Sequence, residues 1–337
     1  MLERLKKYCN TFGPSGMEDE IRRNIIADID GYCEYEIDKI GNIICFKRGK
    51  NTRSNRVALC AHMDEVGVMV DYVTKEGLLH FGTIGGIESK DLCGKYMVLG
   101  EKQINAVIGS KAIHNQKPEE RGVCPPVNQL YMDIGAIDKA DAVRFADIGD
   151  CAVFHPNFTI DGDFVISKAL DNRFGCAALV EIIRGEIEYD TFFAFTVAEE
   201  VGSRGAQTAA YKIGADYAVI CEATAAGEEG ITPPFASPCT VGDGAVISIK
   251  DGGTVYDREF VDIVVEEAKK NNVKYQFKCL PTGSNDSRMF QTSLTGAKVI
   301  AISAPTRYIH SPANVCKTDD LDQVVKLLKV IVDRSYE

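Results

Sequence analysis

Three short apolar runs in this chain each lead into acidic residues or end at a histidine. Residues 56–62 end at His62, residues 191–198 lead into Glu199-Glu200, and residues 217–221 lead into Glu222. Runs of this kind are typical of buried strands in an open α/β sheet, where ligands bind beyond the carboxyl ends of the strands. The sequence therefore predicts an α/β domain whose polar strand ends meet at one rim of the sheet.

Segments with the periodicity of helices alternate with these strands, both before and after a segment that has a different pattern. It predicts helices over 17–29, 172–184, 204–212, 257–271 and 318–333, and further strands are expected over 35–37, 42–47 and 298–303. Between residues 70 and 164, short apolar segments instead alternate with glycine and charged turns, which indicates a small β-barrel or sandwich. The expected division is an α/β domain of residues 1–69 and 165–337, interrupted by a β-rich domain of residues 70–164.

The charge balance limits the partners of this chain. Its 337 residues carry 38 basic and 49 acidic side chains, a net charge of -11, which disfavours nucleic acid and anionic membranes as partners. No apolar run approaches the length of a membrane span, and residues 1–7 lack the apolar core of a signal peptide. We therefore expect a cytoplasmic protein with reduced cysteines, since none of the 12 cysteines has the close spacing of a redox or zinc motif.

Metal-binding side chains recur in five scattered segments. Taken alone, Asp171 before a predicted helix and His310 after an extended stretch have ordinary explanations, as an N-cap and as a structural histidine. Together the segments supply what a two-metal hydrolase centre needs: few histidines, one shared carboxylate, a terminal carboxylate for each ion and a spare carboxylate to move protons. The candidates are His62, Asp64, Asp171, Glu199, Glu200, Glu222 and His310.

The adjacent carboxylates Glu199 and Glu200 need an explanation of their own. Two charges at the end of a buried strand are unfavourable unless they are paired or bound to metal. On an extended backbone their side chains diverge, so one can bind a metal while the other, with a raised pKa, acts as general base. The alternative explanation for the two adjacent glutamates is that they lie at a solvent-exposed edge of the sheet. His62 and Asp64 stand two apart and face one side, where Asp64 could fix the imidazole tautomer.

These segments, in this order, resemble the M42 family of metallo-aminopeptidases over nearly the whole chain. The resemblance is carried by residues 61–67, 169–173, 198–202 and 307–312, and within the insert by 85–86, 107–111 and 130–136. It implies a mixed-sheet catalytic domain of the zinc-peptidase type with an inserted small β-barrel or sandwich. It also implies that the insert drives subunit association into a homo-oligomer, such as a dodecamer.

The resemblance implies a role for each candidate residue. Asp171 would bridge two metal ions, with His62 and Glu222 completing one site and Glu200 and His310 the other. Glu199 would be the general base, and Asp64 would assist from outside the metal shell. Many family members carry aspartate at the position of Glu222, whose side chain is one carbon longer.

The resulting interpretation is a dinuclear metal-dependent aminopeptidase that removes amino-terminal residues from peptides. Two divalent ions, zinc or cobalt, would activate a bridging water whose proton passes to Glu199. Two alternatives stay open: an endoglucanase-type glycoside hydrolase, which requires two carboxylates, and a non-catalytic assembly protein on the same fold. Serine hydrolases and dinucleotide-binding enzymes are disfavoured because their nucleophile and glycine motifs do not occur.

Overall fold

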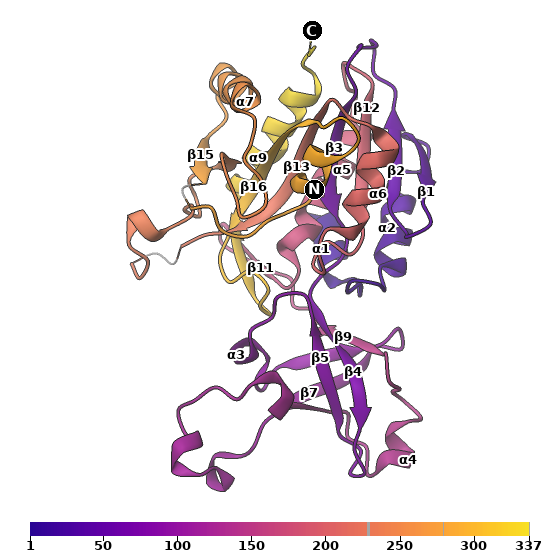
Figure 1. The fold of residues 1–337 in the computed structure, drawn as a ribbon, viewed down its shortest axis with the longest axis vertical. Helices are drawn as coiled ribbons and strands as arrows, with labels where there is room; N and C mark the ends of the chain where they lie inside the picture. The colour runs from indigo at the N-terminus through magenta and orange to yellow at the C-terminus, as the bar shows by residue number, and fades with distance from the viewer. Residues whose placement is uncertain (228–229, 279, 337) are drawn as a thin grey trace.

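The fold is built on an eight-stranded mixed sheet. The structure is a computed structural model that describes residues 1–227, 230–278 and 280–336. The strands are β1 (Glu34–Ile37), β2 (Ile43–Lys47), β3 (Val57–His62), β12 (Thr191–Thr196), β13 (Tyr217–Ala225), β14 (Ala245–Ser248), β15 (Tyr275–Lys278) and β16 (Lys298–Thr306). Their order is β1-β2-β12-β3-β13-β16-β14-β15 (Figure 1). The four central strands, β12, β3, β13 and β16, are parallel to one another. Strand β2 pairs antiparallel with β12 on one side, and β14 pairs antiparallel with β16 on the other.

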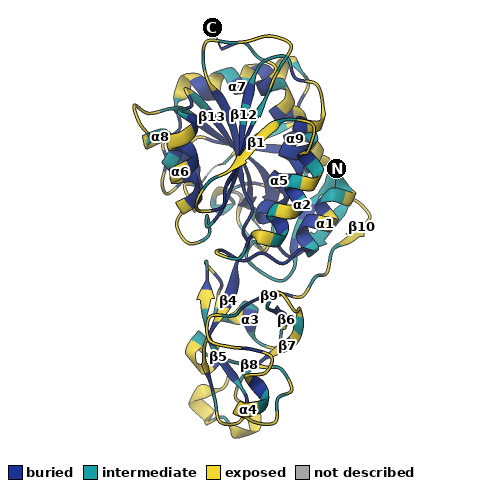
Figure 2. Cartoon of the chain, turned by 90° about the vertical axis from the view of Figure 1, so that its right-hand side faces the viewer, coloured by how far each residue is buried: buried dark blue, intermediate teal, exposed yellow. Residues whose placement is uncertain are grey.

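Helices cover both faces of this sheet (Figure 2). On one face lie α6 (Arg204–Ile213) and α8 (Ser287–Thr292), and on the other lie α5 (Leu170–Arg184) and α9 (Thr318–Val332). The first helices, α1 (Leu2–Asn10) and α2 (Asp19–Ile29), pack against α5, while α7 (Arg258–Lys270) packs beside α9. This double covering explains why the central strands are continuous apolar runs. Across the described ranges, no helix has the length and apolar character that crossing a membrane requires.

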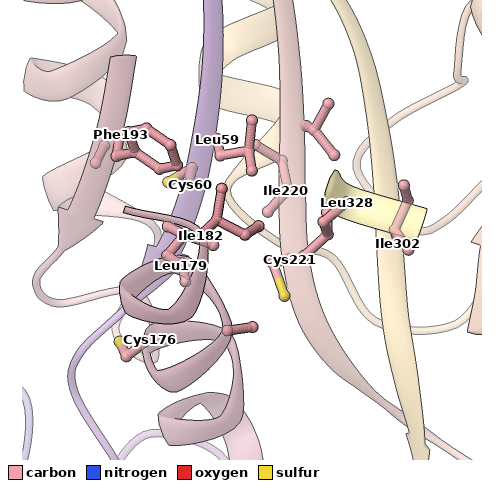
Figure 3. Close-up of a cluster of buried hydrophobic side chains, with 14 of the residues drawn as sticks. Leu59, Cys60, Cys176, Leu179, Ile182, Phe193, Ile220, Cys221, Ile302 and Leu328 are labelled. Carbon is pink, nitrogen blue, oxygen red and sulfur yellow. The ribbon is translucent and has the colours of Figure 1, made fainter. Parts of the chain in front are cut away.

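The main hydrophobic core extends over both faces of the sheet, and one part of it lies between the sheet and α5. Figure 3 shows Leu59 of β3 and Ile220 of β13 close to Leu179 and Ile182 of α5. These side chains are at most 1% exposed, and burying one of this size contributes about 1.5–3 kcal/mol. The eleven described cysteines are free thiols, and several of them, including Cys221, belong to this core.

The β-rich insert closes into a six-stranded barrel, the lower part of Figure 1. In barrel order its strands are β4 (Gly67–Val73), β5 (Leu79–Ile84), β8 (Tyr131–Asp133), β7 (Ile104–Gly109), β6 (Tyr96–Leu99) and β9 (Cys151–Phe154). The barrel has its own core, in which Val68, Leu79, Met97, Ile108 and Met132 are fully buried. The predicted α/β domain with a small β-barrel insert is thus confirmed.

Short elements complete the insert and its return to the sheet. The short helices α3 (Ser89–Leu92) and α4 (Lys139–Ala142) lie in barrel connections. Residues 110–129, here called the excursion, hold three 3-10 turns without buried residues: η1 (Ile113–Asn115), η2 (Pro118–Glu120) and η3 (Val127–Gln129). The barrel strands end at Phe154, whereas the expected insert extends to residue 164. The chain next forms β10 (Thr159–Asp161) and β11 (Phe164–Ser167), which join β17 (Asn314–Lys317) in a separate three-stranded sheet.

Two central strands are longer than the sequence predicted. Strand β13 continues past Cys221 to Ala225, and β16 continues past Ser303 to Thr306, because the two strands pair along their whole length. Glu222 therefore lies within β13, opposite Ser303, and not after the end of a strand. The sequence reading also missed β14, β15 and α8, which are each only four to six residues long, together with the turn η4 (Pro234–Ala236).

A buried cluster of three charges joins the segment after β3 to the start of α5. Glu65 accepts hydrogen bonds from Lys168 Nζ at 2.6 and 2.7 Å and from Arg173 Nη2 at 3.2 Å. None of the three side chains is more than 2% exposed. Arg173 also donates to the carbonyls of Tyr8 and Thr11, so the cluster links three segments that are distant in the sequence.

Replacing Glu65 by glutamine should lower the free energy of unfolding by about 3–5 kcal/mol, because Lys168 and Arg173 would stay buried without a carboxylate. Glu34→Gln is the matched control, since its surface pair with Arg48, at 67% and 75% exposure, contributes less than about 1 kcal/mol. Urea unfolding followed by circular dichroism measures both changes. Equal unfolding midpoints for the two variants would contradict the prediction.

Candidate metal centre

Five side chains from separate parts of the chain meet at one rim of the sheet. His62 ends β3, Glu200 lies in the turn after β12, and Glu222 lies near the end of β13. His310 lies in the loop between β16 and β17, and Asp171 stands at the start of α5, where the backbone is not yet helical. Because the strands involved are parallel, their carboxyl ends bring these residues together, as the sequence predicted for His62 and Glu200.

Asp171 lies at the centre of the group. Its Oδ1 is 3.2 Å from His62 Nε2, and its Oδ2 is 3.3 Å from His310 Nε2. Burial would lower the pKa of each histidine and raise that of Asp171, yet the neighbouring groups act more strongly. Glu222 and Asp171 raise the pKa of His62, Asp171 and Glu200 raise that of His310 to about 9, and the two imidazoles lower that of Asp171. Asp171 therefore binds two imidazoles instead of capping α5.

Two glutamates complete two overlapping groups around Asp171. Glu222 Oε2 is 3.7 Å from His62 Nε2, and Glu200 Oε2 is 3.3 Å from His310 Nε2. Ligand atoms of His62, Asp171 and Glu222 all lie within 4.8 Å of one another, and so do those of Asp171, Glu200 and His310. Each group offers one imidazole nitrogen and two carboxylates, with Asp171 common to both.

The chemistry of these donors fits divalent cations. Burial raises the pKa of both Glu200 and Glu222 well above the usual value, because a carboxylate charge is poorly solvated there. The Oε1 atoms of Glu200 and Glu222 are buried and have no hydrogen-bond partner in the described part of the chain. Imidazole nitrogen and carboxylate oxygen are common ligands of zinc, and a bound cation would offset the repulsion among the three carboxylates.

Hydrogen bonds orient both imidazole rings. His62 Nδ1 is 3.1 Å from the Asp64 carbonyl and 3.3 Å from the Asp64 carboxylate, and His310 Nδ1 is 3.0 Å from the Gly86 carbonyl. Acceptors at Nδ1 favour the tautomer with a proton on that nitrogen, which leaves Nε2 of each ring free to bind a cation.

Asp64 also fixes the backbone that carries the two adjacent glutamates. Its carboxylate accepts hydrogen bonds from Ser15 Oγ at 2.6 Å and from the amides of Glu199 and Glu200, both at 3.1 Å. Burial acts to raise the pKa of Asp64, but hydrogen bonds from His62 and Ser15 lower it below the usual value. Asp64 is thus a charged acceptor that contacts the candidate ligand His62 and both glutamate amides.

Glu199 has the environment of a proton acceptor. Burial, together with the nearby carboxylates of Asp286 and Asp64, raises the pKa of Glu199 to about 8. Its Oε1 accepts a hydrogen bond from Ser203 Oγ at 3.2 Å, and its side chain lines the same pocket as His62 and Asp171. A carboxyl group with a pKa near neutrality can both accept and return a proton at working pH.

The backbone at Glu199 and Glu200 differs from the predicted extended strand. Strand β12 ends at Thr196, and the chain then turns, with Ala198 and Ser203 both at positive φ. Both glutamate side chains line one pocket and do not point to opposite sides of a strand. They nevertheless differ in their contacts, because Glu200 faces His310 whereas Glu199 faces Ser203.

The sequence reading missed four contributors to this pocket. Ser15 and Gly86 act through hydrogen bonds to Asp64 and His310, and they come from the first loop and from the insert. Ser203 holds Glu199, and Lys278 at the end of β15 lines the pocket. The glycine turns around Ser15 and Gly86 were the available signals, but no local pattern indicates Lys278 or Ser203.

Comparison with known proteins gives one consistent result. The profile of the M42 glutamyl aminopeptidase family matches residues 41–327. A relative from Acetivibrio thermocellus that carries an aminopeptidase name is 37% identical, with 97% of each chain covered. A solved TET aminopeptidase from a marine sediment archaeon of the Thaumarchaeota has a TM-score of 0.95 and 30% identity, covering 99% of this chain and 96% of that one. The TET1 peptidase of Pyrococcus horikoshii, which assembles into a tetrahedron or an octahedral shell, has a TM-score of 0.88 and 34% identity, covering 98% of each chain.

Sequence and structure therefore agree along almost the full length of the chain. The family profile covers the α/β domain as well as the barrel, and the similar structures share both. The family, the fold and the class of enzyme predicted from the sequence are confirmed. This chain belongs to the M42 glutamyl aminopeptidase family and is a peptide hydrolase of the aminopeptidase type.

Proposed function

We propose that this protein is a dinuclear metal-dependent aminopeptidase that binds two divalent ions, zinc or cobalt, around Asp171. His62 and Glu222 would hold one ion with Asp171, and Glu200 and His310 would hold the other. One observation carries the proposal: two imidazoles contact the two oxygens of a single buried carboxylate. A carboxylate placed in this way is suited to bridge two cations.

The residues around the proposed ions have separate roles in proton transfer and in positioning. When bound, divalent ions supply Lewis acidity, which lowers the pKa of water and stabilises negative charge on a peptide carbonyl. Glu199 accepts the proton of the attacking water and returns it to the leaving amine, a role that its raised pKa supports. Asp64 holds the amides of Glu199 and Glu200, and thereby positions the base relative to the proposed ligands.

Recognition of a free amino terminus would follow from the acidic lining of the pocket. The protonated α-amino group of a peptide is a cation, and the carboxylates of Glu199, Glu200 and Glu222 all line the pocket. Attraction between opposite charges is strong where water is excluded. An acetylated terminus has no such charge, so the proposed enzyme is an exopeptidase.

Peptides with a free first amine should therefore be shortened stepwise, while acetylated copies persist, as followed by mass spectrometry. A chelator should abolish cleavage, and zinc or cobalt should restore it. Internal cleavage of the acetylated peptide would contradict the exopeptidase proposal. Chelator-resistant cleavage of a glucan would favour the glycoside hydrolase alternative, and a protein that retains no metal after gentle purification would favour the assembly alternative.

The substitutions Glu199→Gln and Glu200→Gln should separate the base from a ligand. Glu199→Gln should keep both ions but lose kcat by on the order of 10²-fold, because no carboxylate accepts the water proton. Glu200→Gln should lose metal from one site and partly recover activity in excess metal. Elemental analysis alongside kcat measures both effects. Near-normal turnover in Glu199→Gln, or equal metal loss in the two variants, would refute these roles.

We also propose that the barrel is the assembly module of a homo-oligomer. The related TET1 peptidase forms closed shells, and another of its solved forms is a dodecamer. The insert exposes several large apolar side chains, as an interface between subunits requires. The most exposed of them are Tyr96, Ile113, Val123, Ile137 and Ile148.

Lys278 supports a preference for an acidic first residue. Relatives of this chain include both a lysyl and a glutamyl aminopeptidase, so family membership alone does not fix the preference. Among the described residues that line the pocket, Lys278 is the one lysine or arginine, and its Nζ donates to the Thr282 carbonyl at 2.7 Å. Burial lowers the pKa of Lys278, whereas the carboxylates of Asp251, Glu222 and Asp171 act to raise it. The acidic residues of the lining all belong to the proposed centre, so a lysyl substrate would find no further anionic partner there.

Lys278→Met should lower kcat/KM for a glutamyl reporter amide by roughly 10- to 100-fold, the size of a lost hydrogen bond to a charged group, and leave a leucyl reporter nearly unchanged. Lys329→Met, at an exposed position of α9, is the control. Steady-state kinetics with both reporters gives the ratio. An unchanged preference in Lys278→Met would exclude this role.

A further inference from the structure

Two cysteine thiols lie together at the edge of the barrel, far from each other in the sequence. Cys93 directly follows α3, and Cys124 belongs to the excursion between β7 and β8. Both contact the same residue: Cys93 Sγ donates to the Ser89 carbonyl at 3.5 Å, and Cys124 Sγ is 3.4 Å from Ser89 Oγ. Burial raises the pKa of Cys93, and contact with the Cys124 thiol raises it further.

This pair differs from the other thiols in its access to solvent. Among the eleven described cysteines, Cys124 is the exposed one. A second pair, Cys33 and Cys45, is also in contact, but Cys45 is fully buried in the sheet. Small oxidants can therefore reach Cys124 without unfolding of the chain, whereas Cys45 is closed to them.

Charged side chains surround the thiol pair. Lys95 acts to lower the pKa of Cys93. The pKa of Lys90 is raised, mainly by Glu88 and to a smaller extent by Cys124. Two ammonium groups thus lie close to the thiol pair. Thiolates are the nucleophiles in thiol–disulfide exchange.

We propose that Cys93 and Cys124 form a reversible disulfide, an oxidative modification site separate from the metal centre. With a small-molecule disulfide as the oxidant, the Cys124 thiolate attacks one sulfur of the oxidant and releases the first small thiol. The Cys93 thiolate then attacks the Cys124 sulfur and releases the second small thiol. The protein loses two hydrogens and two electrons pass to the oxidant, which leaves as two thiols.

The bond would fasten the excursion to α3. In the reduced protein the excursion is held mostly by short-range hydrogen bonds, such as Lys111 Nζ to Glu120 and the turn at Pro118. A disulfide at Cys124 closes a loop that contains β6, β7 and most of the excursion. Closing a loop of this kind restricts the more open states of the chain, so the excursion should open less often.

The test uses the intact protein treated with glutathione disulfide, then alkylated and digested without reduction for mass spectrometry. The expected product is a Cys93–Cys124 linked peptide pair, lighter by two hydrogens than the sum of the free peptides and absent after dithiothreitol treatment. Cys124→Ser should not form it. Cys33→Ser, which alters the other thiol pair, is the matched control and should form it normally.

Limited proteolysis gives an independent measurement. Trypsin should cut after Arg121 more slowly in the oxidised protein than in the reduced one, and oxidation should not slow this cut in Cys124→Ser. The proposal is overturned if Cys124 carries a stable glutathione adduct while Cys93 is alkylated, or if Cys33 and Cys45 become linked in preference. Full alkylation of both Cys93 and Cys124 after oxidant treatment would overturn it as well.

Discussion

The contact of one buried carboxylate with two imidazoles is the constraint around which the α/β domain is arranged. Ionisable groups this close together lose much of their solvation, so the surrounding backbone has to hold them in a geometry in which their contacts offset that loss. The N-terminal part of α5 provides that support. Asn172 donates to the Cys221 carbonyl at 2.7 Å, and Cys176 Sγ donates to the His62 carbonyl at 3.1 Å. Helix α5 is thus tied to both strands that carry the first imidazole and its glutamate partner.

Strand ends were the part of this structure that the sequence predicted best. A buried strand needs a continuous apolar run, so a carboxylate or histidine directly after such a run indicates the rim of a sheet. The apolar runs before His62 and before the Glu199-Glu200 pair therefore indicate that these residues lie at the rim. Asp171 and His310 had no such local signal: their place in the candidate site followed from the combined set of metal-binding segments, and their individual roles followed from the family resemblance.

What the sequence did not reveal depends on contacts between distant segments. The extension of β13 past Cys221 follows from its pairing with β16, and the turn at Glu199 is held by the hydrogen bond that the Glu199 amide donates to the Asp64 carboxylate. Likewise, Lys278 enters the pocket because β15 pairs with β14 at the edge of the sheet. Local periodicity contains no information about such partners, and short strands like β14 and β15 give little pattern of their own.

The hydrogen bond from His310 Nδ1 to Gly86 crosses the boundary between the two structural units. Gly86 follows β5 and precedes α3, so it belongs to the barrel segment, whereas His310 belongs to the α/β domain. The unit that closes into a barrel therefore also determines which nitrogen of an imidazole in the candidate metal centre is available. Its acceptor is a main-chain carbonyl, which side-chain substitution at Gly86 cannot remove but a shift of the loop can. The barrel and the α/β domain are consequently not interchangeable modules. We expect that, during evolution, sequence changes in one domain were accompanied by changes in the other.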